Sequence, residues 1–217
     1  GPVRSAALRA LAKLAAADTV TPLLDLAASA KEEADRAAIV QTVVAICANC
    51  RDKEKCAGPV IAAMNRGDAA QQFALIPALG RLGTSESLAV ARAATGDANA
   101  DLATEAIRVL SQWPSVDAAP HLLDLARTRT DGLQHALALR GCIGLAQLES
   151  DNGKRLAMLQ QALAAAKRPE EKRQALGEIG KIPTREALQA AQALAEDPLL
   201  GKEAAMAVAA IRQQIEP

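Results

Sequence analysis

Three cysteines close together in the sequence are the residues whose type and spacing point most clearly to chemistry. Cys47, Cys50 and Cys56 follow the pattern C-x2-C-x5-C across the polar segment 51–55. A zinc site would need four ligands, and neither a histidine nor a fourth cysteine follows nearby, because Cys142 lies almost three repeats further along. A disulfide between Cys50 and Cys56 would cross a tight turn between two helices. Alternatively, the thiols pack as small apolar side chains, as we expect for Cys47 and Cys142.

The redox state of this pair bears on the location of the protein. A disulfide between Cys50 and Cys56 would indicate an oxidising compartment, and therefore an exported or periplasmic protein. Free thiols would instead favour the cytoplasm. Both alternatives stay open on the sequence alone.

Other residue patterns that support catalysis do not occur in the sequence. His121 and His135 are far apart for a metal-binding pair, and we expect each to be a solvated side chain on the surface. The sequence contains no H-E-x-x-H pair, no G-x-S-x-G turn and no phosphate-binding glycine loop. It therefore predicts a protein that is not an enzyme, with no cofactor and no bound metal.

The composition predicts an all-α protein. Of 217 residues, 52 are Ala and 28 are Leu, both strong helix formers, and only 1% are aromatic. The 25 basic and 25 acidic side chains give a net charge of zero, so we expect no nucleic-acid partner. No uninterrupted apolar run approaches the roughly 18 residues that a membrane span requires, so we expect no membrane insertion.

A short apolar string recurs along the chain and predicts its repeat. Leu79-Gly80-Arg81-Leu82 and Ile179-Gly180-Lys181-Ile182 are two examples of this string. The spacing of the copies predicts about thirteen antiparallel helices in roughly six repeats of about 34 residues, each with a first helix, A, and a second helix, B. The last residues of the strings, which we call anchors, are Leu14, Leu82, Trp113, Leu148 and Ile182.

Two features of the repeats can be predicted from single residues. The A helices are preceded by side chains that can cap free backbone amides. They are Thr21, Thr84, Ser115, Asp151 and Thr184. Trp113 takes an anchor position that aliphatic residues fill in other repeats, so we expect it in the core.

The segment from Ala78 to Arg92, followed by Gly96-Asp97-Ala98-Asn99 and an Ala-rich helix, resembles short bacterial HEAT repeats of the phycobilisome-lyase-like type. The resemblance implies a right-handed α-α superhelix, that is, a HEAT-like solenoid. The tetratricopeptide repeat has a similar period, but its ring residues are missing here. Gly1-Pro2 matches the scar of a tag-removing protease, so we expect residues 3–217 to be a single array taken from a longer protein.

The resemblance implies a protein-interaction, scaffold or spacer module, whose partners are a peptide segment of another protein or neighbouring domains of the parent chain. Two alternatives remain. One is a HEAT-fold enzyme or a lesion-binding protein similar to DNA glycosylases, and the other is a structural accessory domain of a larger exported bacterial enzyme.

The resemblance also implies that B helices line the concave side of the array. The positions expected to face outward there form a shallow ladder of basic and amide side chains, with Glu105 as an acidic exception. Such a surface fits an extended or acidic segment of another protein, although a solvated helix face would show the same pattern. The ladder consists of Arg9, Lys13, Arg81, Arg108, Gln112, Arg140, Gln147, Arg173 and Lys181.

Overall fold

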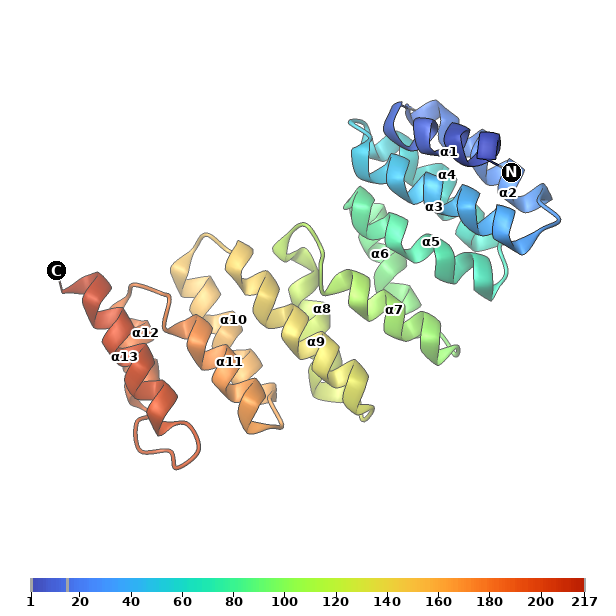
Figure 1. Cartoon of the computed structure of the whole chain (residues 1–217). Coiled ribbons are helices and arrows are strands. Elements are labelled where there is room, and N and C mark those ends of the chain that lie inside the picture. The colour runs from blue at the N-terminus through green and yellow to red at the C-terminus, as the bar shows by residue number, and fades with distance from the viewer. Residues whose placement is uncertain (1, 15, 217) are drawn as a thin grey trace. The chain divides into compact units, whose positions relative to one another are not determined.

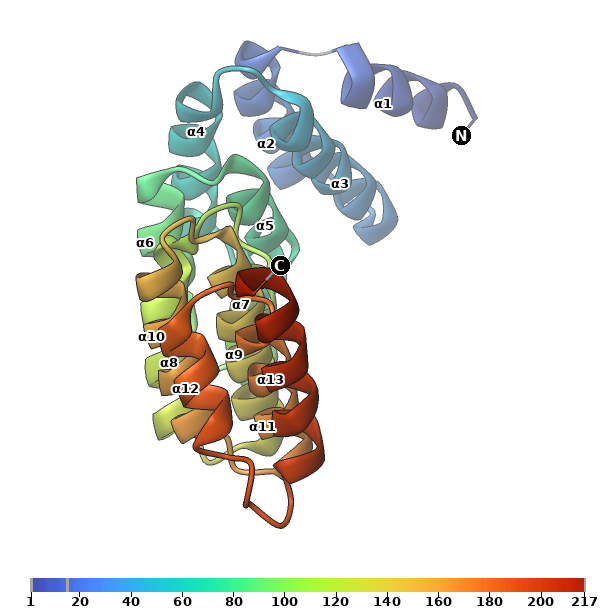
Figure 2. The ribbon, with the colours of Figure 1, turned by 90° about the vertical axis from the view of Figure 1, so that its left-hand side faces the viewer.

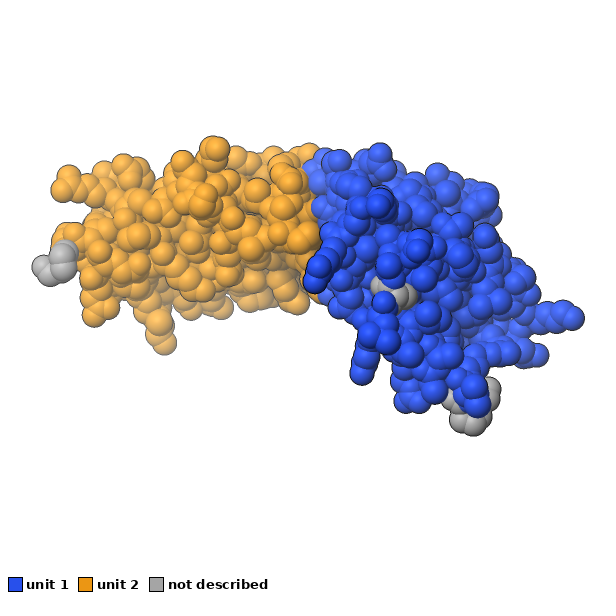
Figure 3. All heavy atoms as spheres, turned by 90° about the horizontal axis from the view of Figure 1, so that it is seen from above, with its two compact units in different colours: residues 1–110 blue, residues 111–217 orange. Residues whose placement is uncertain are grey.

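The structure, a computed structural model, describes residues 2–14 and 16–216. These residues form thirteen α-helices and three short 3-10 helices, without a strand, which confirms the predicted all-α class and number of helices. None of the described helices combines the length and the apolar character that a membrane span requires. The chain divides into two compact units, residues 1–110 and 111–217 (Figure 3). Gly1 of the expected tag scar lies outside the described residues, and Pro2 begins the first helix.

Unit 1 consists of two layers of helices (Figures 1 and 2). The A helices α2, α4 and α6 pack on one another, and so do the B helices α1, α3, α5 and α7. Each A helix also packs on the B helix that follows it. The helices are α1 (Pro2–Leu14), α2 (Val20–Ser29), α3 (Glu33–Asn49), α4 (Lys53–Arg66), α5 (Ala69–Leu82), α6 (Ser85–Ala94) and α7 (Ala100–Leu110), with the 3-10 turn η1 (Ala17–Thr19) before α2.

Unit 2 has the same two layers. Figure 2 shows α8, α10 and α12 on one side and α9, α11 and α13 on the other. The B helix α11 packs on both α9 and α13. The helices are α8 (Ala119–Thr128), α9 (Gly132–Leu145), α10 (Asn152–Ala165), α11 (Pro169–Ile179), α12 (Arg185–Gln192) and α13 (Gly201–Ile215), with the 3-10 turns η2 (Val116–Ala118) and η3 (Ala146–Leu148).

Side-chain caps begin many of these helices. Three of the five predicted caps, Thr84, Asp151 and Thr184, accept a hydrogen bond from a backbone amide in the first turn. Ser115 does not, because a 3-10 turn follows it and its hydroxyl contacts Asp117 instead. The prediction for Thr21 is wrong, because α2 already begins at Val20. Three further caps, which the sequence analysis did not name, begin helices in the same way: Asp52, Asp68 and Asp131.

Close approach of neighbouring B helices explains the small residue inside the repeated string. A Cβ atom added to Gly80 would lie 2.8 Å from Cγ1 of Val109 in α7. A Cβ atom added to Gly180 would lie 3.1 Å from the backbone Cα of Ala207 in α13. A larger side chain at either position would therefore push two B helices apart.

The anchors divide into buried and exposed positions. Leu82, Trp113 and Ile182 are at most 4% exposed, so the prediction that Trp113 belongs to the core is confirmed. Leu148 is not buried like these anchors. It is 53% exposed, because α9 ends at the buried Leu145 and Leu148 lies in the turn η3. Leu14 is 85% exposed at the end of α1, a helix whose main packing partner is α3.

Candidate functional site

The nine residues of the predicted ladder are all exposed, and we call them the B face. They lie on B helices or in the turns that follow them. Gln112, Gln147 and Lys181 lie in turns after the B helices and not on the helices themselves. Unit 1 carries Arg9, Lys13, Arg81 and Arg108, and unit 2 carries Gln112, Arg140, Gln147, Arg173 and Lys181.

Three basic side chains of the B face form ion pairs. Arg108 pairs with Glu105, the acidic exception noted in the sequence. The Nε atom of Arg173 lies 3.1 Å from Oε1 of Glu203, and the Nζ atom of Lys181 lies 2.7 Å from Oε1 of Glu178. These pairs reduce the positive charge that the three side chains offer to a partner.

The other four basic side chains of the B face make no ion pair within the described part of the chain. Arg9 donates only to the carbonyl oxygen of Ser5, within its own helix. The remaining three keep their charge for solvent or for a partner. They are Lys13, Arg81 and Arg140.

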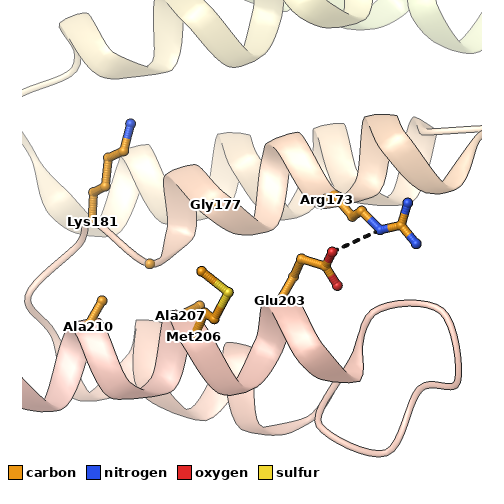
Figure 4. A pocket seen from close by; sticks show the side chains of 8 residues that line it. Arg173, Gly177, Lys181, Glu203, Met206, Ala207 and Ala210 are labelled. Atoms are coloured by element: carbon orange, nitrogen blue, oxygen red, sulfur yellow. Dashed lines mark ion pairs between the residues drawn. The ribbon is translucent and has the colours of Figure 1, made fainter.

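A groove between α11 and α13 adds an apolar surface to the B face of unit 2. Its volume is about 300 Å³, and Gly177, Gly180 and Ala207 contribute to its lining. Figure 4 shows Met206 pointing from α13 toward α11, with the Arg173–Glu203 ion pair at one end and Lys181 at the other. Met206 is 64% exposed and is one of several large apolar residues on the surface of the described chain.

A similar groove lies between the B helices α1 and α3 of unit 1. Its volume is about 370 Å³, and it is lined by Leu8, Arg9 and Ala12 of α1 and by residues of α3. Each unit therefore has a groove between two of its B helices, and at least one basic residue of the B face lines each groove.

The three neighbouring cysteines meet where α3 ends and α4 begins. The Sγ atoms of Cys50 and Cys56 are 3.0 Å apart, and all four cysteines of the chain are free thiols. Cys47 and Cys142 are fully buried, as predicted. Among the described residues, no group of three or more His, Cys, Asp or Glu side chains is arranged to hold a metal ion. The disulfide between Cys50 and Cys56 stays a prediction.

His135 is buried, so the prediction that it is a solvated surface residue is wrong. Its side chain lies inside unit 2 because both ring nitrogens find polar partners there. Nδ1 lies 2.8 Å from the carbonyl oxygen of Ala126 in the last turn of α8, and Nε2 lies 3.2 Å from Oε2 of Glu171 in α11. His135 thus links α9, its own helix, to α8 and α11. It does so by pairing with the carbonyl oxygen of Ala126 and the carboxylate of Glu171, two buried polar groups that need a hydrogen-bond partner.

Glu171 is the centre of this polar cluster. Its carboxylate accepts hydrogen bonds from the backbone amides of Lys167 and Arg168 and from the guanidinium of Arg168. Burial raises the pKa of Glu171, but the hydrogen bonds from Arg168, His135 and the two amides outweigh it and lower the pKa to about 2. Glu171 is therefore ionised at neutral pH and anchors the start of α11.

This cluster was not predicted from the sequence, although the sequence carries one signal of it. His135 and Glu171 are 36 residues apart, which is close to one repeat. Several other side-chain hydrogen bonds span a similar separation, such as the 34 residues from Arg127 to Gln161 and the 38 from Lys167 to Arg129. A search for complementary polar side chains one repeat apart would have found the His135–Glu171 and Arg127–Gln161 pairs.

Trp113 is only 2% exposed. A stacking platform for a nucleic-acid base needs an exposed aromatic face, and the side chain of Trp113 does not offer one. The only other aromatic residue of the sequence is Phe73, which is 44% exposed.

No family model matches the chain, and no curated protein sequence matches it. The resemblance to HEAT repeats therefore stays a prediction from the sequence.

Proposed function

We propose that the chain is a HEAT-like solenoid that serves as a protein-interaction or scaffold module without catalysis of its own. In this proposal the B face binds an extended segment of another protein. The observation that carries it is the groove between α11 and α13, whose apolar lining lies between the basic residues Arg173 and Lys181. The repeat-length separation of polar pairs such as His135 and Glu171 supports the repeat architecture.

The groove defines which side chains such a segment would carry. Met206, Ala207 and Ala210 offer apolar contact, so a partner residue inserted there would be aliphatic. Space for such an aliphatic side chain exists beside Gly177, where an added Cβ atom would meet no atom within 4 Å. The partner therefore contributes at least one aliphatic side chain to the groove.

The charged side chains favour an acidic segment. A partner carboxylate near Arg173 would compete with Glu203, which already forms an ion pair with it. Arg140 has no such competitor within the described part of unit 2 and would therefore contribute more. The proposed partner is an extended segment that carries aliphatic and acidic side chains, either from another protein or from a neighbouring domain of the parent protein.

A peptide-display selection against the intact chain tests this proposal. We expect the selected peptides to combine Asp or Glu with Leu, Ile or Val. In fluorescence anisotropy, the double variant Arg140→Glu and Lys181→Glu, which changes unit 2 alone, should bind a selected peptide at least tenfold more weakly than the wild type, with an unchanged circular dichroism spectrum. The matched control is Arg66→Glu with Arg185→Glu, two exposed arginines on A helices, which should leave binding intact.

Two outcomes would contradict the proposal. Equal binding by wild type and the Arg140/Lys181 variant would mean that the B face of unit 2 is only a solvated surface. Binding of a methylated DNA duplex that persists at high salt in a gel-shift experiment would favour the lesion-binding alternative, because binding through phosphate contacts alone weakens steeply with salt.

A further inference from the structure

The junction between α3 and α4 brings three sulfur atoms together inside unit 1. Cys47 lies in the last turn of α3, Cys50 directly follows that helix, and Cys56 lies near the start of α4. The Sγ atom of Cys56 lies 3.0 Å from Sγ of Cys50, and Cys47 is close enough for its charge to influence the pKa of Cys56. A disulfide bond between Cys50 and Cys56 would require their sulfur atoms to approach by about 1 Å more.

The sulfur atoms differ in their access to solvent. Cys50 is partly exposed, whereas Cys47 and Cys56 are fully buried. Burial raises the pKa of Cys47 to about 11 and contributes most to raising that of Cys56 to about 12. A reagent from solution can therefore reach Cys50 but not the two buried thiols.

Lys53 places a positive charge beside this cluster. Its ammonium group donates hydrogen bonds to the carbonyl oxygens of Cys47 and Ala48 at the end of α3. The same charge partly opposes the effect of burial on the pKa of Cys47 and Cys56. A cation close to several thiols favours the thiolate form through which thiols react.

We propose that Cys50 and Cys56 form a reversible thiol–disulfide site that reacts with small disulfides such as oxidised glutathione. The Cys50 thiolate attacks one sulfur of the glutathione disulfide, forms a mixed disulfide and releases one reduced glutathione. Cys56 then attacks Sγ of Cys50, and its proton passes to the second glutathione as that thiolate leaves. Two protein thiols are thereby oxidised to one disulfide, and one glutathione disulfide is reduced to two thiols.

The bond would tie the end of α3 to the start of α4 across the turn that contains Arg51 and Asp52. The two helices belong to different layers of unit 1, so the site would fix the connection between a B helix and the following A helix. This inference concerns the core of unit 1 and is independent of the peptide surface proposed above.

The test starts from the fully reduced chain in oxidised glutathione, followed by denaturation and labelling with a maleimide. We expect the number of reactive thiols to fall from four to two, and peptide mapping to show protection of Cys50 and Cys56. The Cys142→Ser variant is the matched control, because its distant buried thiol should leave this oxidation unchanged. Retention of all four reactive thiols by the wild type would overturn the proposal.

Two further variants test the order of the steps. In Cys56→Ser the second step is blocked, so the mixed disulfide with glutathione should accumulate on Cys50 and be visible by mass spectrometry. Cys56→Ala gives the same test if the serine destabilises the fold. Cys50→Ser should remain unmodified in the folded state, and its oxidation as fast as that of the wild type would contradict the role of Cys50 as the attacking thiol.

Discussion

The Nε2 atom of His135 lies 3.2 Å from Oε2 of Glu171, and both side chains are buried in unit 2. Nδ1 of the same ring faces the carbonyl oxygen of Ala126. Both ring nitrogens therefore have polar partners inside unit 2. The pair joins α9 to the start of α11, so it should contribute to the stability of unit 2.

The first prediction concerns the acid stability of unit 2. The pKa of Glu171 is about 2 in the folded chain, below its ordinary value of 4.5. Its contribution to stability is therefore complete above about pH 5 and is lost as the pH falls toward about 2, with a magnitude of at most about 3 kcal/mol. Urea unfolding at a series of pH values, followed by circular dichroism, measures this loss.

The matched variants are Glu171→Gln and Glu170→Gln. Glu171→Gln should lower the free energy of unfolding at neutral pH and flatten its dependence on pH in the acid range. Glu170, whose side chain is 62% exposed and pairs with Arg168 over 3.5 Å, should change it by less than about 1 kcal/mol. Equal effects of the two variants would show that the buried cluster adds nothing beyond a surface ion pair.

The second prediction compares two glycines at the end of the same helix. An added Cβ atom on Gly180 would lie 3.1 Å from Cα and Cβ of Ala207, whereas one on Gly177 would meet no neighbouring atom within 4 Å. Gly177→Ala should therefore stabilise the chain by about 0.5–1 kcal/mol through helix propensity. Gly180→Ala should destabilise it, because α11 and α13 would have to separate. Thermal unfolding distinguishes the two, and a gain for Gly180→Ala would contradict the close packing of these helices.

The third prediction uses the single tryptophan. Trp113 is 2% exposed, so Trp113→Ala should reduce the free energy of unfolding by about 3–5 kcal/mol, and Trp113→Phe should reduce it less. The fluorescence of the wild type should be blue-shifted when folded and move to longer wavelength on unfolding. A red emission maximum in the native chain would show that the indole ring is in contact with water.

The fourth prediction concerns the groove between α11 and α13 and rests on the proposed peptide binding. Met206 is 64% exposed, so Met206→Ala should hardly change the unfolding temperature but weaken binding of a selected peptide several-fold. The control is Leu199→Ala, a similarly exposed apolar residue that does not line the groove. If both variants bind as the wild type does, the groove is not part of the binding surface.

The sequence was sufficient to predict the helical class, the number of helices and the burial of Trp113, because these depend on local composition and on a repeating apolar pattern. The apolar pattern wrongly grouped Leu148 with the buried anchors, because α9 ends about one turn before it and an early helix end leaves the pattern almost unchanged. It also misjudged His135, whose burial depends on Glu171, a residue about one repeat away. Pairing across repeats is a tertiary property that a single histidine does not reveal.

The local pattern of helix contacts has a consequence for folding kinetics. Every extensive contact between α-helices joins helices that are neighbours or next neighbours along the chain. Contacts of short sequence separation require little loop closure before they stabilise the chain, so we expect folding to be fast for a chain of this size. We therefore expect the α8–α9 pair to form its contacts before the later helices of unit 2 have folded, so that unit 2 can fold from its N-terminal end while it is being synthesised.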